Sequence, residues 1–158
     1  MPSQKKGTTL IELLIVIGII GVLASVTFLS LFGTRRQNDL KGTSQAIAAL
    51  LREARSRSVA QSSSTSWGVH FENSTVTSPF YALFFSATYA PTTTIGYYRL
   101  PSSVGYASSN IPSGSFKEVT FSQLDGLASA STSVSLYLLT SPTNSSTINI
   151  ASSGAVSY

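Results

Sequence analysis

Residues 5–26 read KKGTTLIELLIVIGIIGVLASV, and this stretch decides the fold of the N-terminal part. Two lysines and one glycine precede an apolar run, and no charged residue occurs in residues 13–32. About 20 helical residues at roughly 1.5 Å each span the ~30 Å hydrocarbon core of a bilayer. The pattern therefore predicts a helix that crosses a membrane once.

Lys5 and Lys6 bear on the orientation of this helix. Positive residues favour the cytoplasmic side, so the two lysines predict a cytoplasmic N-terminus, against the weaker opposing effect of Arg35 and Arg36 beyond the run. The C-terminal body is then expected to face outward. An ordinary secretory signal peptide is the alternative, but its small-residue cleavage site would follow the apolar run, whereas here the glycine precedes it.

Glu12 is the one carboxylate in this stretch. A carboxylate deep in a bilayer costs about 2.5 to 3.5 kcal/mol on insertion scales and usually marks function. An ammonium about 4 Å away is worth ~4 kcal/mol at an effective dielectric of about 20, which offsets that cost. Two interpretations stay open at this point. Glu12 pairs with a cation, or it lies at the interfacial end of the helix among lipid headgroups.

Residues 5–14, KKGTTLIELL, resemble the class III signal sequence of type IV pilins and type II secretion pseudopilins. The resemblance implies a leader of residues 1–7, which a prepilin peptidase removes by cleaving between Gly7 and Thr8 and then N-methylating Thr8. It also implies that Glu12 engages the N-terminal amine of a neighbouring subunit during assembly. Mature chains of the family usually begin with phenylalanine, so Thr8 is a departure from the pattern.

Composition limits the other function classes. The chain has 158 residues, 10% of them charged, and a net charge of +4, which falls to +2 once Lys5 and Lys6 leave with the leader. The positive charge is therefore a weak sign of nucleic-acid binding. There is no cysteine, which excludes disulfides and thiol-ligated metal sites.

Residues 34–61 are expected to continue as an amphipathic helix. One face carries apolar or small side chains at helical spacing, namely Leu40, Ile47, Leu51, Ala54 and Ser58. Glu53 and Arg57 form an i,i+4 pair on another face, to which Arg52 and Arg55 add positive charge. Such a pattern is typical of a solvated helix side.

Residues 62–158 change to a strand-like pattern, which begins where Trp67, Val69 and Phe71 alternate with small or polar residues. Further candidate strands are residues 81–86, 95–100, 118–121, 135–140, 147–150 and 155–158. Turn-rich segments separate them, among them residues 101–103, 112–114 and 141–144.

The fold class is therefore α+β. A long N-terminal stalk helix, with a transmembrane and assembly half (8–33) and an amphipathic half (34–61), packs on a β-rich domain (62–158) with an antiparallel sheet. The pilin resemblance implies the same arrangement. Soft matches in the second half, such as Arg99-Leu100-Pro101 and Ile148-Asn149-Ile150, are most similar to the GspH/FimT group of minor pseudopilins.

Serine and threonine fill many expected loops, notably residues 62–66, 92–94, 129–133 and 145–147. Their hydroxyls keep a surface soluble without charge and hydrogen-bond to the backbone in turns. Glycan attachment is the alternative, because Asn73-Ser74-Thr75 and Asn144-Ser145-Ser146 fit the sequon.

Material for catalysis is scarce. The single histidine, His70, lies in a strand pattern without a cysteine or a clustered carboxylate, so a metal site or a nucleophilic triad has little support. The acidic residues lack the spacing of a calcium loop. We expect neither an enzyme nor a cofactor.

The leading function is a pilin-like subunit of a type IV filament or a type II secretion pseudopilus. It would sit in the inner membrane as a single-pass protein and then in an extracellular or periplasmic filament. Its partners would be other pilin or pseudopilin subunits, prepilin peptidase, the inner-membrane assembly platform and, before assembly, membrane lipid.

Two alternatives remain. A DNA-binding minor pilin for DNA uptake would use five basic residues for phosphate contacts and Tyr97 or Tyr98 for stacking. The five are Arg52, Arg55, Arg57, Arg99 and Lys117. A membrane-tethered adhesin or binding domain that never polymerises would keep its N-terminus uncleaved and would tolerate Glu12→Ala.

Overall fold

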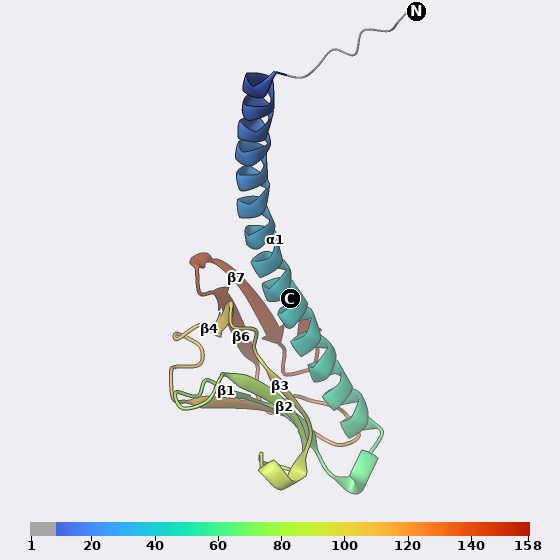
Figure 1. Ribbon diagram of the computed structural model, residues 1–158. Helices are drawn as coiled ribbons and strands as arrows, with labels where there is room; N and C mark the ends of the chain where they lie inside the picture. The colour runs from blue at the N-terminus through green and yellow to red at the C-terminus, as the bar shows by residue number, and fades with distance from the viewer. Residues whose placement is uncertain (1–8) are drawn as a thin grey trace, which may run out of the picture. The chain divides into compact units, whose positions relative to one another are not determined.

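The computed structural model describes residues 9–158, with the backbone alone described for residues 26–33. The chain divides into two compact units, Met1–Arg35 and Arg36–Tyr158. A 50-residue helix, α1 (Leu10–Val59), opens the described part, and two β-sheets follow it in the chain (Figure 1). The predicted α+β class with an N-terminal helix is confirmed.

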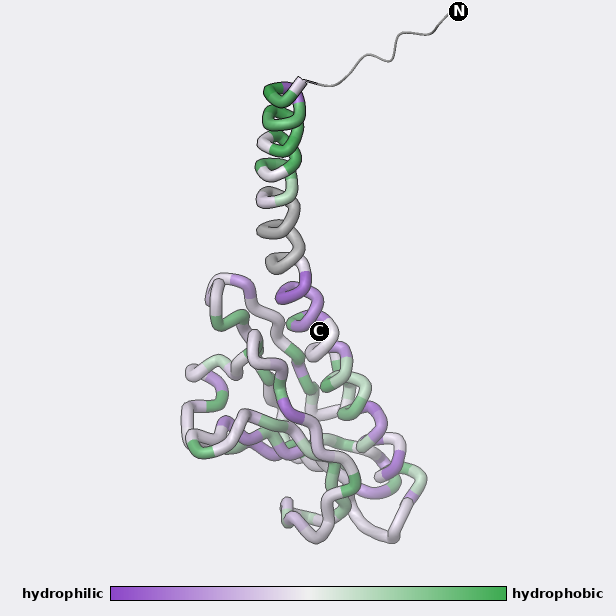
Figure 2. The backbone as a smooth tube through the Cα atoms, viewed as in Figure 1, coloured by the Kyte–Doolittle hydropathy of each residue, from purple (hydrophilic) through white to green (hydrophobic). Residues whose placement is uncertain are grey.

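The first turns of α1 are capped by Thr9. Its Oγ1 accepts a hydrogen bond from the backbone N–H of Glu12 at 3.3 Å, and its carbonyl oxygen accepts the N–H of Leu13 at 3.2 Å. A threonine followed three residues later by glutamate has the spacing of a capping box. The residues after this cap are strongly hydrophobic (Figure 2), and their described side chains are exposed.

Within the described residues, no helical stretch combines the length and the apolar character needed to cross a bilayer. Part of the predicted transmembrane segment, residues 26–33, lies outside the described side chains, as do Gly7 and Thr8 altogether.

The amphipathic half of α1 buries the face that the spacing predicted. Leu40, Ile47, Leu51, Ala54 and Ser58 are all buried, with exposures from 0 to 7%. Ser58 is fixed by two hydrogen bonds, because its Oγ donates to the carbonyl of Phe121 at 3.0 Å and accepts the N–H of Trp67 at 2.8 Å. The helix therefore contacts the sheets through polar as well as apolar groups.

The expected single sheet is wrong, because the strands form two four-stranded antiparallel sheets. Sheet A has the order β3 (Thr94–Arg99), β2 (Phe80–Phe85), β1 (Trp67–Glu72) and β5 (Phe116–Phe121). Sheet B has the order β4 (Val104–Tyr106), β6 (Thr132–Leu138), β7 (Ser141–Ile150) and β8 (Val156–Ser157). Two short 3₁₀ turns, Ser62–Ser64 and Pro91–Thr93, lie in the connections.

Two local expectations also need correction. The segment 141–144, expected as a turn, is the start of β7, since the β6–β7 hairpin turns at Leu139 and Thr140. Pro142 is tolerated there because it lies in an irregular stretch between Ser141 and Ser145, where residues 142–144 have no register partner in β6. The helix expected to reach residue 61 ends at Val59, and Gln61 is left-handed with φ 52°.

One hydrophobic core joins the second half of α1 to both sheets. Its fully buried side chains include Ile47 and Leu51 from the helix, Phe71 and Phe121 from sheet A, and Leu136 from sheet B. On sheet A the predicted inward set of Trp67, Val69 and Phe71 is buried. The opposite face of β1 is buried too, at Gly68 and His70, because aromatic side chains cover it.

Candidate functional site

Glu12 occupies the exposed first turn of α1. Its backbone N–H is used by the Thr9 cap, whereas its carboxylate has no hydrogen-bond or ion-pair partner among the described residues. The positive end of the helix dipole favours negative charge at this position. The arrangement leaves the carboxylate free for a cation from outside the described part of the chain.

The basic side chains on α1 are engaged within the domain. Arg52 donates from Nη2 to the carbonyl of Val156 at 3.0 Å and lies 5.6 Å from the ring centroid of Tyr158. Arg55 donates from Nε to the carbonyl of Gly126 at 3.2 Å and from Nη2 to that of Ser153 at 3.3 Å. Both arginines therefore fasten the helix to C-terminal loops.

The other basic candidates lie apart from these two. Arg57 pairs with Glu53 at 2.6 Å and lies 4.7 Å from the ring centroid of Trp67. Lys117 donates from Nζ to Asn110 Oδ1 at 3.2 Å and to the carbonyl of Ser133 at 3.0 Å, and partial burial lowers its pKa.

Arg99 is exposed on the edge strand β3, without a polar partner in the described chain. Of the five predicted phosphate contacts, the structure brings only Arg52 and Arg55 into one cleft. Tyr97 and Tyr98, the predicted stacking residues, are half-exposed on β3. DNA binding stays a prediction.

Two glycine turns receive the Arg55 guanidinium. Gly126 and Gly154 have φ of +63° and +77°, which L side chains rarely adopt. A Cβ on Gly154 would lie 2.1 Å from the Gly126 carbonyl oxygen and 2.7 Å from Arg55 Nε. Neither turn has room for a side chain, so the arginine and the glycines form one packing unit.

Asp125 shapes the turn that contains Gly126. Its carboxylate accepts a hydrogen bond from the Ser122 hydroxyl and another from the Leu127 N–H. These bonds favour the ionised form and lower the pKa of Asp125, with the Ser122 bond as the largest cause.

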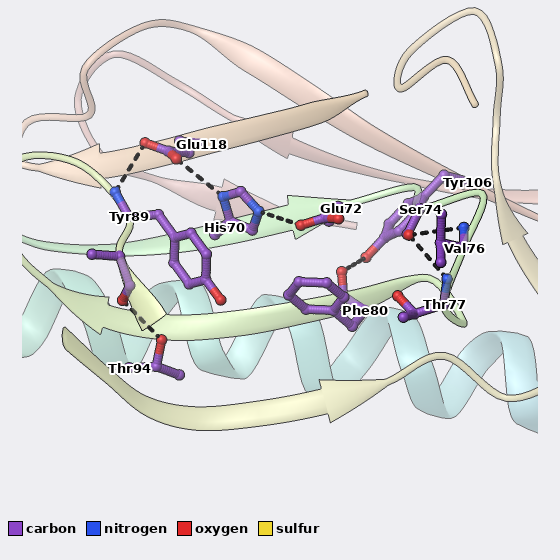
Figure 3. Close-up of polar contacts among 11 residues, drawn as sticks. His70, Glu72, Ser74, Val76, Thr77, Phe80, Tyr89, Thr94, Tyr106 and Glu118 are labelled. Carbon is purple, nitrogen blue, oxygen red and sulfur yellow. Dashed lines mark hydrogen bonds and ion pairs between the residues drawn. The ribbon is translucent and has the colours of Figure 1, made fainter. Parts of the chain in front are cut away.

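His70 was wrongly expected to lack nearby carboxylates, since the structure places two beside it (Figure 3). Its Nδ1 lies 3.0 Å from Glu118 Oε1, and its Nε2 lies 3.3 Å from Glu72 Oε2. A ring nitrogen donates to a carboxylate oxygen only when that nitrogen carries a proton. Both hydrogen bonds therefore form together only when both ring nitrogens are protonated. The side chain is 4% exposed.

Aromatic rings and a backbone contact complete the His70 cluster. The Tyr89 ring stacks on the imidazole with centroids 3.9 Å apart, and Phe116 stacks at 5.3 Å. Glu118 also accepts the N–H of Tyr89 at 3.4 Å, which ties the preceding loop to the sheet. In the described part of the chain, no group of three or more His, Cys, Asp or Glu is arranged to hold a metal. The cluster therefore holds β1, β5 and the loop at Tyr89 together.

Sequence reasoning could have found one half of this cluster. Glu72 follows His70 by two residues and so shares its face of β1. Glu118 is 48 residues away, and only the pairing of β1 with β5 places it opposite His70. That register has no signal in a single sequence.

Both the N-terminal segment and the fold of this chain are similar to those of known proteins. Residues 2–28 match the model of the prokaryotic N-terminal methylation motif. The structure is similar to the crystal structure of the type IV minor pilin FimU of Pseudomonas aeruginosa, with a TM-score of 0.54. The chain thus combines a methylation motif at its N-terminus with a fold similar to that of a type IV minor pilin.

The two structures share 12% sequence identity over 75% of this chain and 90% of the other, so this likeness shows the fold alone. No curated protein matches the sequence. The predicted resemblance to type IV pilins is confirmed, whereas the place within the GspH/FimT group stays a prediction.

Proposed function

We propose that this pilin-like chain is a structural subunit of a type IV filament or a type II secretion pseudopilus. Prepilin peptidase cuts after Gly7 and methylates Thr8. Before assembly, the subunit spans the inner membrane with its N-terminus on the cytoplasmic side. The assembly platform then adds it to a filament with other pilin or pseudopilin subunits. Glu12 pairs with the N-terminal amine of a neighbour during this step.

The methylation motif at residues 2–28 carries the proposal. It contains the cleavage position, the residue to be methylated and Glu12. The capped start of α1 supports it, because cleavage after Gly7 leaves a new N-terminus one residue before the Thr9 cap. Exposed apolar side chains on the following turns add further support, since monomeric soluble proteins rarely expose a contiguous apolar surface of this kind.

Mass spectrometry of the N-terminal peptide, taken from sheared filaments of the native host, tests this function. We expect a chain that begins at Thr8, with a methyl group on its amine. A chain that begins at Met1 or Pro2, found in membranes and absent from filaments, would contradict the proposal and leave the tethered binding domain.

Glu12→Ala separates assembly from processing. We expect the processed variant to accumulate in the membrane while its amount in filaments falls by at least tenfold, because the amine of the neighbour loses its counter-charge. Glu53→Ala is a matched control, since it removes an exposed carboxylate from the same helix. That carboxylate already has Arg57 as its partner within the domain. Normal filament yield from Glu12→Ala would exclude the amine pair.

A further inference from the structure

Two clefts meet at Tyr137 on the outer side of sheet B. The first has a volume of about 310 Å³, and its lining includes Tyr137, Gly105 and Leu100. The second has a volume of about 550 Å³ and shares Tyr137 and Ser108 with the first. The volume of the first lies at the lower end of the range of small-ligand sites, whereas the second is a shallow hollow that is open to solvent. Tyr137 therefore forms a common wall between two neighbouring spaces.

Gly105 leaves room for the Tyr137 ring beside β4. The two residues face each other across β4 and β6. A Cβ on Gly105 would lie 3.5 Å from two atoms of the ring and 3.1 Å from Leu139 Cδ2, so the ring stands against the backbone of β4. A tyrosine has only two side-chain torsions, so its ring offers a large contact area that loses little entropy on binding.

The described side chains that line the two clefts carry no charge. They carry hydroxyls instead, from Ser78, Ser102, Ser108 and Ser113 in the first cleft and from Ser109, Ser135, Ser145 and Thr147 in the second. Ser135 and Thr147 hydrogen-bond to each other at 3.0 Å. The four serines of the first cleft have no side-chain hydrogen bond to any other described residue, so their hydroxyls can serve a ligand.

Tyr106 contributes a buried phenol to the first cleft, and its hydroxyl donates to the carbonyl of Phe80 at 3.0 Å (Figure 3). Burial raises the pKa of Tyr106, which keeps the phenol neutral. Neither cleft therefore offers a cation to a phosphate or carboxylate, nor a carboxylate to an amine.

We propose that the two clefts bind an uncharged oligosaccharide that crosses Tyr137. A neutral sugar presents one apolar C–H face, which matches the ring, and a rim of hydroxyls, which matches the serines and threonines. Two neighbouring clefts that share the ring suit adjoining sugar units better than one isolated monosaccharide. This binding role is separate from filament assembly and does not depend on it.

Saturation-transfer NMR tests the proposal on the full chain in phosphocholine micelles, because a detergent with a sugar headgroup would compete. The probes are maltotriose, cellotriose, chitotriose and mannotriose, with sialyllactose and hyaluronan tetrasaccharide as charged controls. We expect at least one neutral trisaccharide to bind in the millimolar range. The same trisaccharide presented on glycan-coated beads distinguishes a free sugar from a surface glycan as the natural source.

Two variants place the binding at Tyr137. Tyr137→Ala removes the platform and should weaken binding roughly tenfold, as expected for the loss of one stacking contact. Gly105→Val keeps every polar group and narrows the first cleft, so it should also weaken binding. Tyr97→Ala is the control, because Tyr97 is an exposed strand tyrosine on sheet A that lines neither cleft. Thermal unfolding of each variant shows that it is folded.

Three outcomes would overturn the proposal. One is the absence of a signal from every neutral trisaccharide at its solubility limit. Another is a signal from the charged probes alone. The last is binding that Tyr137→Ala and Tyr97→Ala affect equally. Loss of filament yield from Tyr137→Ala without any sugar binding would instead assign the surface to a neighbouring subunit.

Discussion

The described apolar side chains of α1 are exposed in its first half and mostly buried in its second half. In the first unit, Leu10, Leu14 and Ile20 are 59 to 80% exposed, and apolar side chains surround the helix. In the second unit, Ile47 and Leu51 are fully buried, and charged residues occupy the other faces. A helix that is hydrophobic all round needs partners along its whole circumference, whereas one with a single apolar stripe needs one sheet. The exposed half is the one to which the proposed function assigns contacts with other molecules, whereas the buried stripe of the second half stabilises the domain.

The largest expected effect comes from the same substitution in the two halves. Leu51→Ala should lower the free energy of unfolding by about 2 to 5 kcal/mol, because it leaves a cavity in the core. Leu14→Ala should change it by less than about 0.5 kcal/mol, because the side chain is exposed. Urea unfolding of the full chain in detergent, followed by Trp67 fluorescence, measures both. Equal effects would remove the contrast between the halves.

A smaller effect is expected at Ser58, whose buried hydroxyl links α1 to β1 and β5. Ser58→Ala removes the partner of the Trp67 N–H and of the Phe121 carbonyl, which are left buried. We expect a loss of about 1 to 3 kcal/mol in the same unfolding measurement. Ser56→Ala, at an exposed position of the same helix, is the control and should be nearly neutral. A neutral Ser58→Ala would show that water replaces the hydroxyl.

The smallest effect concerns the pH dependence at Asp125. Its pKa is lowered in the folded state, so its contribution is present above the unfolded value of about 3.9 and disappears as the pH falls through the folded value. Asp125→Asn should therefore remove a small part of the loss of thermal stability below about pH 4. Ser122→Ala should act in the same direction. Identical melting curves for Asp125→Asn and the unchanged chain at every pH would contradict the assignment.

Periodicity explains which parts of the fold were predictable. The buried stripe of α1 follows the 3.6-residue repeat, and most strands follow from alternating apolar residues, so both are local properties of the chain. β4 was missed because three residues are too few to show a period. The division into two sheets was missed because it depends on which strands pair.

The candidate sites divide in the same way. The methylation motif is a contiguous stretch, so the sequence alone was enough to predict it. The partners of Arg52 and Arg55 are backbone carbonyls about 70 to 100 residues away, and no sequence pattern points to them. The same is true of Glu118 beside His70.

Cysteine cross-linking in filaments tests the central claim most directly. The chain has no cysteine of its own, so each introduced thiol is unique. Ile19→Cys lies in the exposed apolar half of α1, and Ala48→Cys lies in the buried stripe. After oxidation of sheared filaments, we predict disulfide-linked dimers from Ile19→Cys and none from Ala48→Cys. Filaments that form normally but give no dimers from Ile19→Cys or other single cysteines at residues 10–25 would contradict the claim that this half of α1 packs against its neighbours.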